Sequence, residues 1–358
     1  MIFQRQSALI SALFRFYIGK SRWARITSGW TQKNYALKSM YKVFITRKIP
    51  EIGIKLLQKK YDVKVSPYDR VLTQSEIIKM GKGCGALLSL LTDTIDGRVM
   101  DGIGKQLRIV ANYAVGYNNI DVGAARQRDI MVTNTPGVLT EAVVEHTIAL
   151  IFAIAERIVE SDEFVRRGKF RGWEPMLFLG TSIIGKTLGI LGLGRIGMEV
   201  ARRMHDGFEV KIIYYDIKRD RKVEREWGLK YVNFSALIRK SDFLSVHVPL
   251  LPKTRHLIGA KELKMMKKNA CLINTSRGPV VDEKALVSAL KKKIIKGAAL
   301  DVFEEEPKLA PGLVKLDNVV LTPHIASATE ETRAKMSEMA AKNIIAALSG
   351  KRPPNLIK

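Results

Sequence analysis

The chain has 358 residues, of which 46% are hydrophobic, and its formal net charge is +25. This length favours two packed cores with a cleft between them, and the sequence contains no run of about 18 uncharged apolar residues, which argues against a membrane span. The two cysteines, Cys84 and Cys271, belong to no CxxC or Cys/His pattern, which argues against a disulfide framework or a zinc site and indicates a reducing compartment.

The excess positive charge is spread along the chain. The first 39 residues carry Arg and Lys without any Asp or Glu, and further lysines gather at 261–268 and 291–293 without interleaved aromatic residues. Solvated helix faces account for this pattern, so we expect neither a nucleic-acid partner nor a membrane partner.

Residues 1–39 are expected to lie outside the fold. The segment is rich in Arg, contains Ser and lacks acidic residues, which is typical of a mitochondrial transit peptide. Alternatively, the natural protein starts at Met40, directly before the β-rich run YKVFIT. We favour the start at Met40 and a cytoplasmic location, with the mitochondrial matrix as the alternative.

From Met40 onward, short β-rich runs alternate with helical ones. The β-rich runs are YKVFIT, YDVKV, GALLSL, LRIVANYA and IMVTN, and helices are expected at 51–60, near position 75 and between the last two strands. Such alternation predicts a parallel sheet covered by helices. This first unit ends near Pro136.

A long apolar run follows at 141–170, with the sequence EAVVEHTIALIFAIAERIVESDEFVRRGKF. It continues beyond the usual helix length and is apolar over much of its circumference in the first half. We expect one long helix here that packs against another subunit.

The second unit repeats strand and helix from TLGIL through VKIIYYD, FLSVHVPL, ACLINTS, KGAALDVF and NVVLTPHI, as doubly wound dinucleotide-binding domains do. A final helix at 329–348 is expected to return to the first unit. The predicted fold class is therefore α/β, with two Rossmann-like parallel-sheet domains and a cleft between them. A flavodoxin-like substrate domain comprises 40–138 plus 326–358, and an NAD-binding Rossmann domain comprises 139–325.

The cofactor site is predicted at a glycine-rich turn between the strand TLGIL and the helix that begins with Arg195 and Ile196. Gly192 makes the tight turn, Gly194 allows a pyrophosphate to approach bare backbone, and Gly197 lets the helix approach the strand. The phosphates then meet the N–H groups of a helix N-terminus.

Asp216 ends the next strand, IIYYD, where an acidic residue is expected to bind the ribose hydroxyls. Because its carboxylate repels a 2′-phosphate, we expect NAD(H) rather than NADP(H). Lys218 and Arg219 lie just beyond it, and their positive charges would weaken the preference for NAD(H), so NADP(H) stays an alternative.

Seven motifs in order resemble those of D-isomer-specific 2-hydroxyacid dehydrogenases, most of all the glyoxylate and hydroxypyruvate reductase branch. They are NYAVGYNNID, NTPGVLTEA, GLGRIG, HVPL, INTSRGPVVDE, LDVFEEEP and LTPHIAS. The resemblance covers nearly everything from Met40 to the C-terminus. It implies that Arg277, Glu306 and His324 are the catalytic residues of an NAD-dependent reductase of small 2-oxo acids.

The chemistry of such a reduction calls for these residue types. A hydride reaches the carbonyl carbon while a proton reaches its oxygen, and histidine supplies protons well near neutral pH, so His324 is the expected general acid. Glu306 would fix the imidazole tautomer and stabilise its charged form. Arg277, at the end of the strand in ACLINTS, would grip the substrate carboxylate through two parallel hydrogen bonds.

Further positions follow from the resemblance alone. Backbone N–H groups of two loops are implied to bind the substrate carboxylate, and two residues of the second unit are implied to contact the cofactor, with Asp301 bonding the nicotinamide carboxamide. The substrate-binding positions are Leu91, Thr92, Val115 and Gly116, and the cofactor-binding positions are Thr275 and Asp301. The other histidines have no metal-ligand spacing, so no metal is expected.

One segment departs from the branch, in which W-x-P-x-W-x-x-G precedes the glycine-rich strand and an aromatic residue reaches the partner's active site in a homodimer. This sequence has Trp173 and Pro175 but Leu177 in place of the second Trp. A homodimer is still expected, while the choice among small 2-oxo acids is open.

Two other functions are compatible with this fold. A 3-phosphoglycerate dehydrogenase often carries a regulatory C-terminal domain, for which the short stretch after His324 leaves no room. A non-metabolic NAD-sensing corepressor shares the fold, but the intact Arg277, Glu306 and His324 argue for an enzyme.

Overall fold

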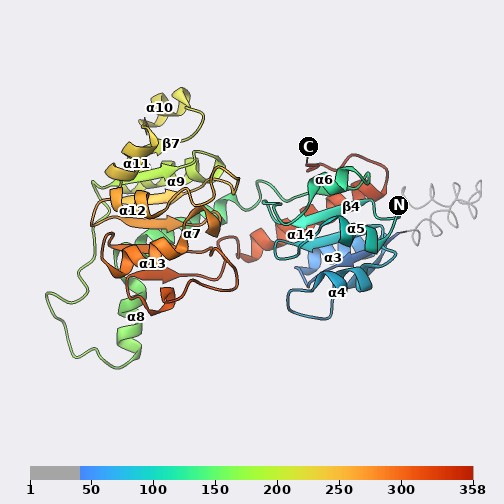
Figure 1. The fold of residues 1–358 in the computed structure, drawn as a ribbon, viewed down its shortest axis with the longest axis horizontal. Helices are drawn as coiled ribbons and strands as arrows, with labels where there is room; N and C mark the ends of the chain where they lie inside the picture. The colour runs from blue at the N-terminus through green and yellow to red at the C-terminus, as the bar shows by residue number, and fades with distance from the viewer. Residues whose placement is uncertain (1–40, 358) are drawn as a thin grey trace, which may run out of the picture.

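The computed structural model describes residues 41–357, so the predictions for 1–39 and for a start at Met40 lie outside the described residues. Within this range the chain forms two lobes side by side, each a parallel sheet with helices on both faces (Figure 1). The predicted α/β class with two parallel-sheet units is confirmed.

The first lobe contains a five-stranded sheet in the order β2-β1-β3-β4-β5, with every neighbouring pair parallel. This is the strand order of flavodoxin-like sheets. All five predicted β-rich runs form strands: β1 Lys42–Ile45, β2 Asp62–Val65, β3 Ala86–Leu90, β4 Ile109–Tyr113 and β5 Met131–Thr133.

Five helices cover this sheet: α3 Glu51–Gln58, α4 Gln74–Gly81, α5 Gly97–Ile103, α6 Val122–Arg126 and α14 Glu330–Leu348. The C-terminal helix α14 packs on α3 and β4 and crosses from the second lobe to the first (Figure 1). Helix α5 was not predicted, because its sequence GRVMDGI contains two glycines of low helix propensity. It forms because Asp96 caps it and because Gly102 lets it approach Ile78 of α4.

The second lobe contains a seven-stranded parallel sheet in the order β12-β11-β10-β9-β6-β7-β8. The strands are β6 Thr187–Leu191, β7 Lys211–Tyr215, β8 Lys230–Tyr231, β9 Phe243–Val246, β10 Cys271–Asn274, β11 Gly297–Leu300 and β12 Val319–Leu321. The two-residue edge strand β8 is too short to show an alternating pattern, so the sequence did not reveal it.

The helices of this lobe are α9 Arg195–Phe208, α10 Arg221–Trp227, α11 Phe234–Lys240, α12 Ala260–Met265 and α13 Glu283–Lys291, with 3-10 turns η1 Gly278–Val280 and η2 Leu313–Lys315. Two apolar clusters, one on each face, bury the sheet between α7 (Thr140–Ala155) and α9 on one side and α11, α12 and α13 on the other. No helix in 41–357 is long and apolar enough to cross a membrane.

The long apolar run forms two helices rather than the one predicted, α7 Thr140–Ala155 and α8 Ile158–Arg166. The chain breaks at Arg157, whose φ is 56°, in the left-handed region that ends a helix. Helix α7 buries half of its residues against α9 and the strands β10 to β12 of its own chain. That this run also packs on another subunit stays a prediction. Helix α8 has no buried residues and projects from the lobe (Figure 1).

Candidate active site

A small cleft of about 180 Å³ lies between the lobes. Leu91, Gly116, Asn118 and Asn119 line it from the first lobe. The second lobe contributes Leu250, Arg277, Gly278, Pro279, Phe303, Glu304, Glu306 and His324. The structure therefore brings together five residues that the sequence placed in the site from distant segments: Leu91, Gly116, Arg277, Glu306 and His324.

His324 and Glu306 form the expected pair, with His324 Nδ1 2.8 Å from Glu306 Oε2. The other carboxylate oxygen of Glu306 accepts a hydrogen bond from the Phe303 N–H at 3.0 Å. Burial alone would raise the pKa of Glu306, but the hydrogen bond and charge of His324 outweigh it and hold this pKa below its usual range. A carboxylate on Nδ1 leaves Nε2 as the ring nitrogen available to a substrate.

Asp301 fixes the loop that carries His324. Its side chain has no exposed surface, and its oxygens accept hydrogen bonds from Thr322 Oγ1 at 2.7 Å and from the N–H groups of Ile325 and Ala326 at 2.8 Å. His146 Nε2 lies 3.4 Å away. The carboxylate is thus directed at residues on both sides of His324, which itself has a φ of 55°. The implied contact of Asp301 with a nicotinamide carboxamide stays a prediction.

Arg277 follows β10 and is held by two partners. Its Nη1 donates to the Ser276 carbonyl at 2.7 Å, and its Nε lies 3.5 Å from Asn118 Oδ1. The Nη2 end occupies the space where a Cβ on residue 116 would lie, so glycine at that position admits the guanidinium. Burial lowers the pKa of Arg277, and the nearby Glu306 carboxylate opposes that shift. A buried guanidinium with free N–H groups is suited to binding a carboxylate.

The two loops that face Arg277 offer backbone donors. Among the residues that the structure describes, the N–H groups of Leu91, Thr92, Val115 and Gly116 donate no hydrogen bond. The loop containing Leu91 follows β3, and the loop containing Gly116 follows β4, so both lie at the carboxyl ends of neighbouring strands. Unpaired N–H groups in such a place are available to an anionic ligand.

The glycine-rich turn has the geometry of a phosphate-binding turn. Gly192 has a φ of 97°, a Cβ on Gly197 would clash with the Gly192 carbonyl, and a Cβ on Gly194 would meet nothing within 4 Å. Helix α9 starts after Gly194, which has no side chain to cap the first-turn N–H groups. Open space beside uncapped N–H groups at the start of a 14-residue helix fits a pyrophosphate.

Asp216 follows β7 and faces this turn. Its carboxylate accepts hydrogen bonds from the N–H of Leu193 at 2.8 Å and of Lys218 at 3.1 Å. Of the two basic residues beyond it, Arg219 is paired with Glu224 at 2.7 Å. Thr275 lies directly after β10, and its hydroxyl is 2.9 Å from that of Thr147.

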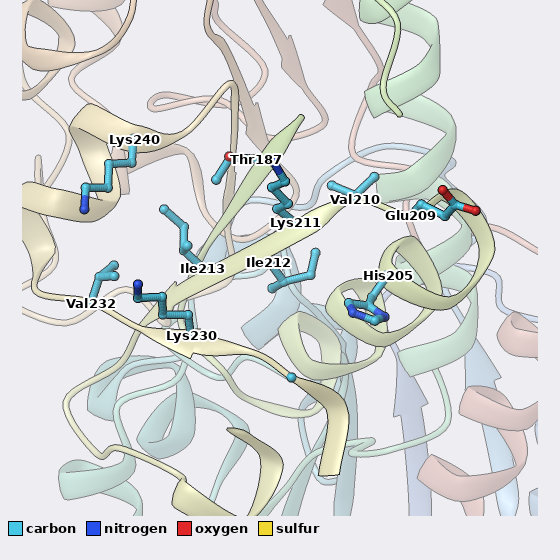
Figure 2. A pocket seen from close by; sticks show the side chains of 11 residues that line it. Thr187, His205, Glu209, Val210, Lys211, Ile212, Ile213, Lys230, Val232 and Lys240 are labelled. Atoms are coloured by element: carbon cyan, nitrogen blue, oxygen red, sulfur yellow. The ribbon is translucent and has the colours of Figure 1, made fainter. Parts of the chain in front are cut away.

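A larger cavity of about 560 Å³ lies elsewhere, beside the starts of β6 and β7. Figure 2 shows its lining, with Lys211, Lys230 and Lys240 around Ile213 and with His205 from the end of α9. This is the amino-terminal edge of the second sheet, opposite the glycine-rich turn. Ligands of open α/β sheets bind at the carboxyl edge, so the small cleft, rather than this cavity, is the candidate active site.

Several cleft residues were not predicted. Asn118 touches Arg277, and Leu250, Phe303 and Glu304 complete the lining. Glu304 is also paired with His256, at 2.5 Å between Oε1 and Nε2. The adjacent asparagines of GYNNID and the run of glutamates in DVFEEEP were the signals, but periodicity does not tell which of neighbouring polar residues faces a cleft.

Comparison with known proteins agrees with this geometry. The sequence profile of the family described as D-isomer specific 2-hydroxyacid dehydrogenase, NAD binding domain, matches residues 148–326. A glyoxylate reductase of Thermococcus litoralis is 52% identical over 320 residues, which are 88% of this chain and 96% of that protein.

Solved structures are similar as well. A glyoxylate reductase from Paecilomyes thermophila has a TM-score of 0.78 at 30% identity, covering 88% of this chain and 98% of that one. An NADPH-dependent glyoxylate/hydroxypyruvate reductase from Sinorhizobium meliloti, in complex with NADP and malonate, has a TM-score of 0.77 at 31% identity, covering 88% and 96%.

Proposed function

This chain belongs to the D-isomer-specific 2-hydroxyacid dehydrogenase family and is an NAD(P)-dependent oxidoreductase, and from that premise we propose that it reduces glyoxylate or hydroxypyruvate to the 2-hydroxy acid with NADH. The observation that carries the proposal is the placement of the His324–Glu306 pair and the Arg277 guanidinium around one small cleft. Relatives that bear the name glyoxylate reductase support the choice of substrate.

His324 donates the proton in this reaction. With Nδ1 bound to Glu306, its Nε2 gives a proton to the carbonyl oxygen of the substrate as that carbon receives a hydride. Glu306 stabilises the imidazolium before transfer, because its lowered pKa keeps it ionised at neutral pH. Asp301, through Ile325 and Ala326, holds the ring in position.

The substrate carboxylate binds between the lobes. Arg277 meets it with paired N–H groups, and the free N–H groups of Leu91, Thr92, Val115 and Gly116 complete the anion site. A cleft of about 180 Å³ fits an acid of two or three carbons. Orientation by several donors places the carbonyl against His324 and lowers the entropic part of the barrier.

The glycine-rich turn would hold the dinucleotide cofactor, which would supply the hydride. The N–H groups of Arg195, Ile196 and Gly197 at the start of α9 would bind its pyrophosphate, with Gly192 shaping the turn and Gly194 leaving room. Asp216 binds the ribose hydroxyls and favours NADH over NADPH. Thr275 borders the nicotinamide side of the site.

The division into domains follows the two sheets, with 40–138 plus 326–358 as the substrate domain and 139–325 as the cofactor domain. A cytoplasmic homodimer is the proposed working form. The support for a second copy is the apolar surface on the segment after α8, where Trp173 is 85%, Met176 74% and Ile184 67% exposed. Surface of this kind, gathered on one projecting segment, is typical of protein interfaces.

The test is NADH oxidation with a panel of small 2-oxo acids. We expect turnover with glyoxylate or hydroxypyruvate, and a loss of roughly 100-fold or more in kcat for His324→Ala and in kcat/KM for Arg277→Ala, with NADH binding retained. His205→Ala, on the exposed end of α9, is the matched control and should keep full activity. Absence of turnover across the panel, with NADH still bound, would refute the proposal.

A further inference from the structure

Three asparagines connect the two loops of the proposed anion site, and although they lie in the motifs NYAVGYNNID and NTPGVLTEA, the sequence assigned them no role. Asn112 lies on β4 and is fully buried, Asn119 lies in the loop after β4, and Asn134 follows β5 directly. We call Asn112, Asn119 and Asn134 the asparagine cluster. All of their side-chain amide donors point at backbone carbonyls or at each other.

Asn119 holds the loop after β3. Its Nδ2 donates to the carbonyls of Leu90 and Asp93, both at 3.0 Å. Those two carbonyls flank Leu91 and Thr92, so one amide closes the loop that contains both residues. Asp93 Oδ2 adds a bond from the Leu90 N–H at 2.8 Å.

Asn134 and Asn112 hold the loop after β4. Asn134 Nδ2 donates to the Val115 carbonyl at 2.7 Å, and Asn112 Nδ2 donates to the Gly116 carbonyl at 2.8 Å. Asn112 Nδ2 also donates to Asn119 Oδ1 at 3.0 Å and so supports the amide that holds the loop after β3. Ser89 on β3 donates to Asn112 Oδ1 at 3.1 Å and thereby keeps the Nδ2 group directed at the loop.

Peptide geometry turns these carbonyl contacts into orientation of the neighbouring N–H groups. In a trans peptide the C=O and the next N–H point in opposite directions, and both of these peptide bonds are trans. Fixing the Leu90 carbonyl toward Asn119 therefore directs the Leu91 N–H the other way. Fixing the Val115 carbonyl toward Asn134 does the same for the Gly116 N–H. These are two of the N–H groups that donate no hydrogen bond within 41–357.

We infer that the asparagine cluster positions the Leu91 and Gly116 N–H groups for the substrate carboxylate and so sets the affinity for the 2-oxo acid. The inference rests on the proposed function and adds positioning residues to it. Without these amides the loop after β3 keeps only the bonds between Leu90 and Asp93, at 2.8 and 3.1 Å, and the Val115 carbonyl loses the side chain that fixes it. Preorganised donors bind an anion without the cost of ordering the loop after contact.

Steady-state kinetics of Asn119→Leu and Asn134→Leu test the inference, since leucine has the branched shape of asparagine but no donor. Each variant is expected to raise KM for glyoxylate about 10-fold, the equivalent of one hydrogen bond to a charged group, and to leave kcat within about 3-fold. The inhibition constant of oxalate, a non-reacting dicarboxylate, should rise in parallel, while the NADH dissociation constant stays unchanged. Asn119→Ala provides the same comparison if the leucine variant does not fold.

Ser337→Ala is the matched control. Ser337 is fully buried on α14 in the same lobe, and its hydroxyl donates to the Pro50 carbonyl at 2.7 Å, away from the cleft. It should lower the melting temperature like the asparagine variants but leave KM unchanged. Asparagine variants that lose stability and keep the KM of the wild type would overturn the inference. Failure of the proposed function is separate, since the wild-type protein would then turn over no 2-oxo acid.

Discussion

The close approach of Arg277 to Gly116 allows a sharp test of the site, the substitution Gly116→Ala. The backbone at this position is not in the left-handed region, so alanine strains nothing there. Its Cβ, however, would occupy the place of Arg277 Nη2. Arg277 Nη2 then has to move, and because Nη1 is bound to the Ser276 carbonyl, the movement disturbs that bond and the paired N–H groups that face the substrate.

The size of the effect follows from the bonds that are lost. Hydrogen bonds to a charged group are worth about 1.5 to 3 kcal/mol each, so losing the paired contact costs roughly 3 kcal/mol. At about 1.4 kcal/mol per factor of ten, kcat/KM for glyoxylate should fall roughly 100-fold. The assay is NADH oxidation at subsaturating substrate, with NADH binding measured by fluorescence and expected to be unchanged.

Gly207→Ala is the control, because a Cβ there meets nothing within 4 Å and the residue lies on α9 outside the cleft. This variant should keep the kcat/KM of the wild type. If Gly116→Ala keeps kcat/KM within about 3-fold while the protein is folded, the guanidinium does not bind substrate from the position seen in the structure, and the reasoning is refuted.

Three other predictions address the pair, the cofactor and the dimer. Because the pKa of Glu306 is lowered in the folded protein, its carboxylate stabilises the fold above the usual carboxyl pKa of about 4.3, and this stabilisation is lost as the pH falls. The unfolding free energies of the wild type and of Glu306→Gln should therefore converge in acid. A difference between them that does not change with pH would contradict this. Asp216→Ser should raise the ratio of kcat/KM with NADPH to that with NADH at least about 10-fold, and an unchanged ratio would remove Asp216 from cofactor selection. Trp173→Asp combined with Met176→Asp should give monomers in analytical ultracentrifugation, while wild-type sedimentation would show that this surface is not the interface.

Much of the site could be predicted from sequence because its parts are local. Gly192 with its positive φ, Gly197 against the Gly192 carbonyl, and the uncapped start of α9 are properties of one short segment, and a motif reports them directly. Arg277 and His324 follow strands of the second sheet, so strand prediction alone brought them to the same edge.

Prediction failed where distant residues decide the outcome. Helix α5 depends on the approach of Gly102 to Ile78 of α4, which apolar periodicity does not encode. Periodicity also does not show the left-handed residue Arg157, at which the long apolar run breaks. The sequence also did not reveal the bonds of Asp301 to Ile325 and Ala326, because they join residues more than 20 positions apart.

The sequence by itself determined the fold class, the glycine-rich turn and the catalytic residue types, because those depend on backbone geometry and chemistry within short segments. Only the tertiary structure decided which side chains meet. It brought Arg277 into the space left by Gly116 across the lobes, and it joined Asn112, Asn119 and Asn134 to the carbonyls of two loops. The physical reason is that a hydrogen bond between segments depends on the packing of both, which neither segment specifies alone.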